Sequence, residues 1–374
     1  MHVETYRWTE SKGWDSHLST DPSVNLVFVC AEHPFFHDPQ CYEEIRAFFP
    51  VAEIIGCSSS GNICGDHISD QDIILSAISF SATRVLVNSA LIEDKADVDS
   101  AVTRLANAFA DPKPKHLFAL SDGLSISGSE LTRRLNALGI PVTGGLAGDA
   151  DRFHSSWVMV NGPALQHQVA LVGFYGDLNV TYGFSTGWRE FGPERRVTRS
   201  VENIVYEIDH RPALEVYTKY LGELSKDLPG SGLRFPLSVT DGISGSSYVR
   251  TLLGINREEQ SLNFAGDVPQ GSVCKLMKTD IDSLIDASAG LTKTLHHDAS
   301  KNESLCLVVS CVGRRLVMDQ IAGEEIEAIQ PYWVQRQLYS AFIPMVRLPP
   351  LSLLFAPYIT RLRLSPCFRN KKNL

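Results

Sequence analysis

Two glycine-rich loops carry the residues best suited to chemistry. The first, Gly56-Cys57-Ser58-Ser59-Ser60-Gly61, follows an apolar run that is typical of a buried strand. A serine-hydrolase elbow of the form G-x-S-x-G would need glycine where Ser60 stands, so that signature is missed by one residue. The loop therefore predicts either a cradle whose N–H groups and hydroxyls bind an anion or carboxylate, or a purely structural turn.

The second loop is Gly144-Gly145-Leu146-Ala147-Gly148-Asp149, which places three glycines and an acid within six residues. Such glycines permit positive φ angles or a close approach of the backbone to another group. Asp149 can then pair with a ligand's ammonium group or cap a helix, so a ligand site and a structural turn both remain open. Arg152 and His154 follow directly, and His154 is the best-placed candidate axial ligand if the chain binds haem non-covalently.

A third group of candidates lies further along the chain. Gly187-Trp188 and Arg199 supply an aromatic ring and a cation near a predicted domain boundary at residues 187–197. Small-molecule pockets often form at such boundaries. We therefore count Trp188 and Arg199 among the candidate ligand-binding residues.

Composition and missing motifs exclude several classes of protein. The 374 residues contain 34 Lys and Arg against 43 Asp and Glu, and only seven of the positive charges lie after Gln330. Residues 1–330 thus carry a net charge of −16, which argues against nucleic-acid binding by this part of the chain. The sequence contains no G-x-x-x-x-G-K-[ST], no G-x-G-x-x-G opening a helix, no H-E-x-x-H and no C-x-x-C-H.

The cysteines and the ends of the chain predict a cytoplasmic protein. Eight cysteines occur without a C-x-x-C pair, and several lie inside apolar runs where a free thiol behaves as a small hydrophobe. The first residues lack the basic and apolar regions of a secretory signal. The most apolar part of the C-terminal segment, Leu348 to Ile359, is interrupted by prolines and is shorter than the ~20 residues of a membrane span.

Apolar periodicity predicts a mixed α/β (α+β) fold. Short buried-strand patterns such as Val24–Cys30 alternate with helical patterns such as Val98–Ala110 in the first half. Adjacent strands predominate after Val169, where Ala213–Leu221 predicts a helix and Leu305–Val312 a strand. We expect two mixed-sheet halves with flanking helices.

Seven motifs occur in an order that resembles one family, the FIST domain family with its N-terminal and C-terminal domains. The resemblance extends from about residue 20 to residue 329. The motifs are Gly56-Cys57-Ser58-Ser59-x-Gly61, Ser121-Asp122-Gly123, Gly144-Gly145-Leu146-Ala147-Gly148-Asp149, Gly187-Trp188, Tyr206-Glu207-Ile208-Asp209 leading to Pro212-Ala213, Phe264-Ala265-Gly266-Asp267, and Ser310-Cys311-Val312-Gly313-Arg314.

The resemblance implies a sensory, ligand-binding protein without catalysis. Members of the family work beside histidine kinases, cyclic-di-GMP enzymes and chemotaxis receptors. Amino acids have been proposed as ligands, and some stand-alone members of similar size are haemoproteins that sense nitric oxide. A serine-dependent hydrolase using the first loop and a non-sensory scaffold remain as alternatives.

We accordingly predict an N-terminal FIST domain at residues 1–190 and a C-terminal FIST domain at residues 191–330. The predicted ligand-binding residues are Cys57, Ser58, Ser59, Ser121, Asp122, Gly144, Gly145, Asp149, Arg152, Trp188, Arg199 and Asp267, with His154 as a metal ligand only if haem binds. The ligand is expected to be an amino acid or haem with nitric oxide, and the partner a histidine kinase or a cyclic-di-GMP enzyme.

Residues 331–374 depart from the family pattern. This segment is basic, contains six of the 19 prolines and lacks glycine. The family continues here with a Phe-Tyr-Ser-Tyr-Gly-Glu-Ile segment and then a Leu-His-Asn-Gln-Thr segment, both absent from this chain. We interpret residues 331–374 as an aberrant tail produced by a frameshift near Gln330, and expect the second half to lack its terminal strands. The alternative is a genuine basic tail that binds membrane surfaces.

The frameshift can be tested on the gene. Met345 is encoded by ATG and the Val346 codon begins GT, so a frame shifted by one base reads N-A-T and then G-G-T, in which the second codon specifies glycine. In that frame the codons of Ala341 to Leu348 can spell the first family segment, and those of Leu354 to Leu362 the second. Sequencing should find both; a stop codon there, or the lack of His-Asn-Gln, would contradict the hypothesis.

Overall fold

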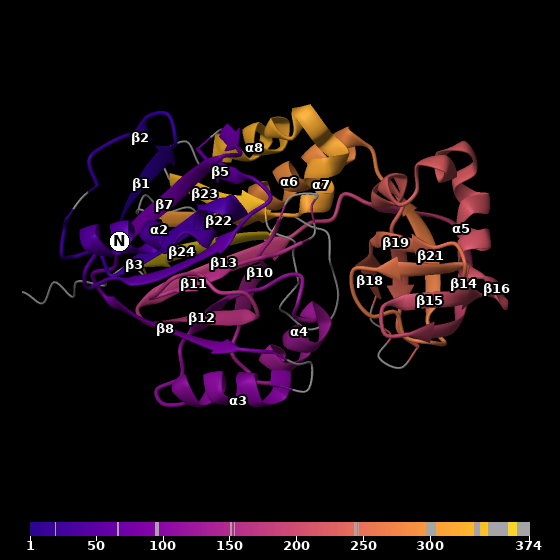
Figure 1. The fold of residues 1–374 in the computed structure, drawn as a ribbon, viewed down its shortest axis with the longest axis horizontal. Helices are drawn as coiled ribbons and strands as arrows, with labels where there is room; N and C mark the ends of the chain where they lie inside the picture. Colours follow the sequence, from indigo (N-terminus) through magenta and orange to yellow (C-terminus); the bar gives the residue numbers. More distant parts are fainter. Residues whose placement is uncertain are drawn as a thin grey trace, which may run out of the picture.

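The computed structural model describes residues 1–18, 20–65, 67–93, 97–149, 152, 154–242, 245, 247–296, 304–332, 337–342 and 358–364. Helices and mixed sheets alternate along these residues, which confirms the predicted mixed α/β class. Figure 1 shows a large body that contains both ends of the described chain and a smaller unit beside it. We call residues 1–188 and 279–364 the main body, and residues 189–278 the inserted unit.

The first sheet of the main body has the strand order β11-β4-β3-β7-β1-β2. Its centre is the parallel pair β3 and β4, and the other pairings are antiparallel. One face is covered by α1 (His33–His37) and α2 (Pro39–Phe48). The strands are β1 (His2–Thr9), β2 (Gly13–Trp14), β3 (Leu26–Ala31), β4 (Glu53–Ser58), β7 (Asp72–Ser79) and β11 (Val158–Val160).

The second sheet has the order β10-β9-β12-β8, with β9 and β10 parallel. Its outer face packs on α3 (Val98–Ala108) and α4 (Gly128–Asn136), the latter beginning where the Ser127 side chain accepts a hydrogen bond from the Glu130 N–H. Its inner face meets the first sheet across a shared apolar core. The strands are β8 (Thr83–Leu91), β9 (His116–Ser121), β10 (Val142–Leu146) and β12 (Gln168–Gly176).

A third sheet joins distant parts of the chain in the order β13-β24-β22-β23-β5-β6. Alternate residues of β22 face opposite cores: Leu305 and Leu307 pack in the core between the sheets, whereas Cys306 and Val308 pack with residues of α8. The elements are β5 (Asn62–Cys64), β6 (His67–Ser69), β13 (Leu178–Phe184), α6 (Ile281–His296), β22 (Ser304–Ser310), α7 (Val312–Met318), α8 (Gly323–Ile329), β23 (Gln337–Phe342) and β24 (Tyr358–Leu364), with 3-10 turns η4 (Asp319–Ile321) and η5 (Gln330–Tyr332).

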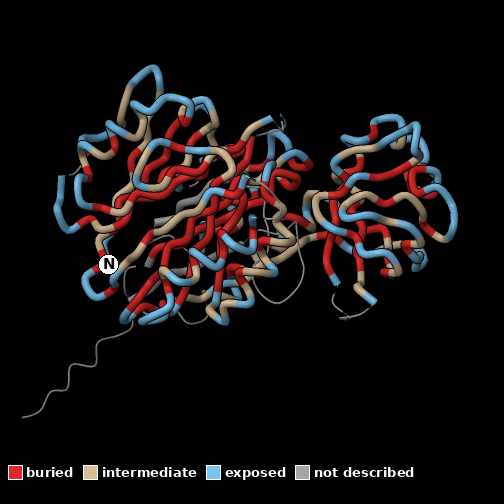
Figure 2. The backbone as a smooth tube through the Cα atoms, turned by 60° about the horizontal axis from the view of Figure 1, so that its bottom comes forward, coloured by how far each residue is buried: buried red, intermediate tan, exposed pale blue. Residues whose placement is uncertain are grey.

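The inserted unit is a curved antiparallel sheet around its own core, as the separate buried interior in Figure 2 illustrates. Its strand order is β18-β17-β21-β14-β15-β20-β19. The elements are β14 (Arg189–Val201), β15 (Ile204–Ile208), β16 (Arg211–Pro212), α5 (Ala213–Leu221), η2 (Gly222–Asp227), η3 (Gly230–Arg234), β17 (Leu237–Thr240), β18 (Ser247–Arg250), β19 (Leu252–Asn256), β20 (Ser261–Phe264) and β21 (Val273–Lys278).

After Gln330 the architecture differs from the sequence-based expectation. The segment after Gln330 contributes β23 and β24, which pair with β22 on its two sides. The structure thus forms strands in the segment after Gln330, where the second half was expected to lack its terminal strands. Strand formation depends on backbone hydrogen bonds, which nearly any sequence can supply, so these pairings do not test the proposed frameshift.

The expected limit between residues 190 and 191 falls inside β14. After β21 the chain returns to the main body through α6, so the inserted unit interrupts the main body. The division into domains at residues 1–190 and 191–330 stays a proposal.

Gly144 provides a test of how closely β9 and β10 approach. It has φ of +145°, and a Cβ atom there would lie 1.9 Å from the Ala119 carbonyl oxygen. We expect Gly144→Ala to lower the free energy of unfolding by at least about 2 kcal/mol. The matched control is Gly290→Ala in α6, where nothing lies within 4 Å and a gain of up to about 1 kcal/mol is expected. Urea unfolding measures both; equal effects would contradict the close approach.

Candidate functional site

The two glycine-rich loops meet at the carboxyl ends of β3, β4 and β10. Glu32 and His33 follow β3, Ser59 follows β4, and Asp149 lies three residues after β10. The Gly148 N–H donates to the Ser58 carbonyl oxygen at 2.8 Å, which brings the loops together across the two sheets. The carboxyl ends of strands in α/β sheets are where ligands most often bind.

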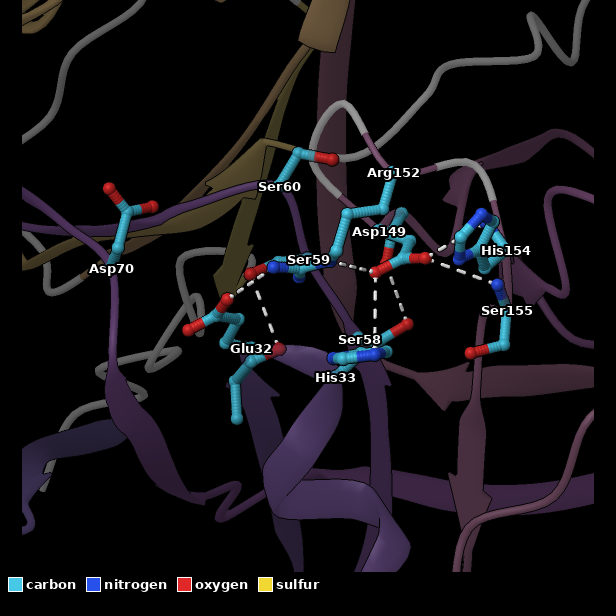
Figure 3. A network of polar contacts seen from close by, with 12 residues as sticks. Glu32, His33, Ser58, Ser59, Ser60, Asp70, Asp149, Arg152, His154 and Ser155 are labelled. Carbon is cyan, nitrogen blue, oxygen red and sulfur yellow. Dashed lines mark hydrogen bonds and ion pairs between the residues drawn. The ribbon is translucent and has the colours of Figure 1, made fainter.

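Asp149 is the centre of the polar contacts drawn in Figure 3. Its Oδ2 accepts hydrogen bonds from the backbone N–H groups of His154 and Ser155 at 3.0 and 3.1 Å, and its Oδ1 accepts from Arg152 Nε at 2.8 Å. The residue is only 3% exposed. Burial opposes ionisation, but these hydrogen bonds outweigh it and hold the pKa of Asp149 below its ordinary value of 3.8.

Arg152 bridges two acids from different loops. Its Nη1 lies 2.9 Å from Glu32 Oε1, while its Nε binds Asp149. The Arg152 side chain is 36% exposed, so it forms the solvent-facing rim of this group. We call Glu32, His33, Asp149 and Arg152 the charge cluster. With His33 neutral, the cluster carries one net negative charge.

His33 contributes the least satisfied polar atom of the cluster. Its Nε2 lies 3.7 Å from Asp149 Oδ1, whereas its buried Nδ1 has no hydrogen-bond partner among the described residues. Burial lowers the pKa of His33 below 6.5, against the attraction of the Asp149 carboxylate. The His33 ring packs on His37, whose ring packs on Trp157.

Ser58 and Ser59 have structural partners. The Ser58 hydroxyl donates to the Gly148 carbonyl at 2.8 Å and accepts from the Trp157 N–H at 2.9 Å. The Ser59 hydroxyl donates to Asn62 Oδ1 at 2.7 Å. Both hydroxyl protons are thus donated to acceptors within the protein.

Asp122 anchors a neighbouring loop. It is fully buried, and its carboxylate accepts hydrogen bonds from the backbone N–H groups of Leu124, Ser125 and His167 and from the Ser156 hydroxyl. The Ser121 hydroxyl donates to the Asp122 carbonyl at 3.2 Å. These bonds use the acceptor positions of Asp122 within the protein.

Cys57 lies in β4 and is fully buried, whereas Gly144 and Gly145 lie in β10, paired with Ala119 and Leu120 of β9. His154 reaches the cluster through its backbone N–H. Among the described residues no group of three or more His, Cys, Asp and Glu side chains is arranged to hold a metal ion.

Three predicted residues lie outside the charge cluster. Trp188 is buried in a separate core, with its ring 5.8 Å from the Arg314 guanidinium carbon. On the inserted unit, Arg199 pairs with Glu207 at 3.0 Å, and Asp267 is exposed with its carbonyl accepting from Arg250. Their role in ligand binding stays a prediction. Conversely, sequence analysis missed Glu32 and His33, whose only signal is their position directly after a buried strand.

α7 ties the first loop to the C-terminal part of the chain. Arg315 donates to the Ser60 carbonyl and forms a two-pronged ion pair with Asp70, both distances being 2.7 Å. Gly61 has φ of +122°, and a Cβ atom there would lie 1.9 Å from Arg315 Nη1. The neighbouring Arg314 is fully buried and pairs with the equally buried Glu325 at 2.6 Å. The loop bearing Ser59 is thus held in place by Arg315, a residue of the C-terminal part of the chain, which is itself paired with Asp70 close to the loop in sequence.

This fold and loop arrangement define a mixed α/β protein with a polar site at the carboxyl ends of its parallel strands. The chain belongs to the FIST family: it matches the FIST N domain over residues 25–211 and the FIST C domain over residues 213–339. FIST domains are sensory domains of signalling proteins.

The chain is also similar to the uncharacterized protein MJ1623 of Methanocaldococcus jannaschii. The two are 24% identical over 332 residues, which cover 79% of this chain. The chain spans 61% of the length of that relative.

Replacing Asp149 tests how much the hydrogen bonds of its ionised carboxylate stabilise the fold. We expect Asp149→Asn to lower the free energy of unfolding at pH 7 by about 2 kcal/mol, because charge-assisted hydrogen bonds to a buried carboxylate are lost. The folded pKa is depressed, so this stabilisation is present above pH 3.8 and is lost as the pH falls through the lower folded value.

Urea unfolding between pH 7 and pH 3 measures the difference between the wild type and Asp149→Asn. The exposed Asp227→Asn is the matched control and should change stability by less than about 0.5 kcal/mol. A difference that stays constant down to pH 3 would contradict the ionised state of Asp149.

Proposed function

We propose that this protein senses a small ligand at the charge cluster and passes its ligand state to a separate partner protein, such as a histidine kinase or a cyclic-di-GMP enzyme. The observation that carries the proposal is the charge cluster itself, which brings Glu32 and His33 at the start of α1 together with Asp149 and Arg152 of the connection after β10. Its Arg152 side chain, which is 36% exposed, offers a group that a ligand can engage.

The charges favour a ligand with an ammonium group. Glu32 and Asp149 outnumber Arg152, so a cation is attracted to the site, and a carboxylate on the same ligand can bind the exposed side of Arg152. An amino acid has both groups. We therefore propose amino acids as the ligand class and binding without catalysis as the activity.

Haem is the alternative ligand within the family. Asp149 accepts the backbone N–H of His154 and lies 3.7 Å from His33 Nε2, and Arg152 pairs with both Asp149 and Glu32. These polar and charged groups suit a polar ligand better than a porphyrin, whose faces require apolar contacts.

We further propose a cytoplasmic location. The seven described cysteines are all free thiols, which is typical of a reducing compartment. Within the described residues, no helix has the length and apolar character needed to cross a membrane.

A thermal-shift screen against the twenty amino acids tests the proposed ligand class. We expect one or a few of them to raise the unfolding temperature of the wild type in a concentration-dependent way, because a ligand that binds only the folded state stabilises it. Asp149→Asn should abolish the shift, whereas Asp227→Asn, which removes an exposed acid of the inserted unit, should retain it.

Two outcomes would contradict this function. A Soret band in the purified protein that shifts with nitric oxide would favour the haem alternative. Ester hydrolysis that Ser58→Ala abolishes would favour the enzyme alternative. The visible spectrum and an esterase assay therefore accompany the screen.

A further inference from the structure

Cys30 and Cys57 form a facing pair of thiols beneath the two loops. They occupy the same register position on the parallel strands β3 and β4, so their side chains project from the same face of the sheet. That face borders the core between the sheets, where Cys57 is fully buried and Cys30 is partly exposed. Both are free cysteines.

The hydrogen bond with Cys30, together with burial, raises the pKa of the Cys57 thiol well above its ordinary value of 9.0. The Cys57 thiol is therefore protonated at neutral pH, and a metal ion must displace its proton to bind the sulfur.

The spacing of the strands favours a bridging ion over a disulfide. Neighbouring strands lie about 4.8 Å apart, whereas a disulfide needs Cβ atoms about 3.5–4.5 Å apart. The strands cannot easily be drawn together, because β3 is held between β4 and β7, and β4 between β3 and β11. A linear two-coordinate ion separates its sulfurs by twice the metal–sulfur bond, on the order of 4.6 Å for a bond of about 2.3 Å.

We propose that Cys30 and Cys57 form a linear two-thiolate site for a soft metal ion with a filled d shell, of the kind represented by copper(I) and mercury(II). Thiolates select such ions over hard cations, which prefer oxygen ligands. This inference goes beyond the proposed function, because it involves neither the charge cluster nor its ligand.

Binding is an exchange of protons for metal without oxidation. The ion forms two metal–sulfur bonds, and both thiol protons pass to solvent. With mercury(II) the product is neutral, whereas with copper(I) it keeps one negative charge. Burying an uncompensated charge is unfavourable. For each metal, the affinity for the protein is therefore divided by the affinity for a free dithiol. We expect this ratio to be larger for mercury(II) than for copper(I).

Anaerobic titrations of the full chain test the site, with copper(I) supplied as its bathocuproine disulfonate complex and mercury(II) in a separate series. We expect one tightly bound ion and two released protons per chain, and two sulfur neighbours in the X-ray absorption spectrum of the metal. Cys30→Ala and Cys57→Ala should each weaken this binding at least 100-fold. Cys41→Ala and Cys274→Ala, which remove thiols of α2 and of the inserted unit, should leave it unchanged.

Several results would overturn the proposal. Equal metal affinity in the wild type and in both Cys30→Ala and Cys57→Ala would place the metal elsewhere. Mass spectrometry that finds a Cys30–Cys57 disulfide after mild oxidation, together with no metal binding by the reduced protein, would assign the pair to redox chemistry instead.

Two further measurements distinguish failure of the metal proposal from misfolding of a variant and from failure of the proposed function. Cys30 is partly exposed, so Cys30→Ala should keep the circular dichroism and melting behaviour of the wild type even if Cys57→Ala does not. Asp149→Asn should retain metal binding while losing the amino-acid response. Failure of one proposal therefore leaves the other intact.

Discussion

The arrangement of the site depends on the four hydrogen bonds that Ser58 makes at the end of β4. Its backbone N–H and carbonyl pair with Trp157 and Gly148, and its hydroxyl bonds the same two residues again, at distances of 2.8 to 2.9 Å. Both partners lie in the connection that runs from β10 of the second sheet to β11 of the first, so one buried residue fixes this connection near each of its ends. Without this junction, Asp149 would have no fixed position relative to Glu32 and His33.

A second constraint connects this edge to the rest of the molecule through α7. Arg315 bonds the loop at Ser60, while Val317 and Met318 of the same helix pack with Leu233 and Val249 of the inserted unit. A displacement of the loop would therefore act on a helix that touches the inserted unit. Such contiguous packing is a physical route by which two regions can influence each other.

Local patterns in the sequence predicted the elements well and the long-range contacts poorly. The helix at Ala213–Leu221 was predicted at its observed limits, because its apolar spacing and the preceding proline are local signals. The strand predicted at Leu305–Val312 instead ends at Ser310, and α7 begins two residues later. There the Cys311 sulfur accepts a hydrogen bond from the Gly313 N–H, and Arg314 is held by Glu325, contacts that periodicity does not reveal.

The same distinction applies to the site. The contact between Asp149 and Arg152 spans three residues, and both were predicted. Ser58 was predicted as a ligand residue because its partners, about 90 to 99 positions away, are invisible in the local sequence. Glu32 and His33 were missed for the same reason, since their importance arises only when β3 and β10 converge.

The attachment of the inserted unit has a consequence for how such proteins can be built. Arg189 and Lys278 are paired in register on β14 and β21, so the chain enters and leaves the unit on two neighbouring strands. The Thr279 hydroxyl donates to the Gly187 carbonyl at 2.8 Å, which joins the two connecting segments where they leave the main body. A segment whose ends already touch can be exchanged, lengthened or lost in evolution without altering the path of the surrounding chain. These paired connecting segments thus make the inserted unit a module. Its surface can change in evolution and acquire new binding partners while the charge cluster stays intact.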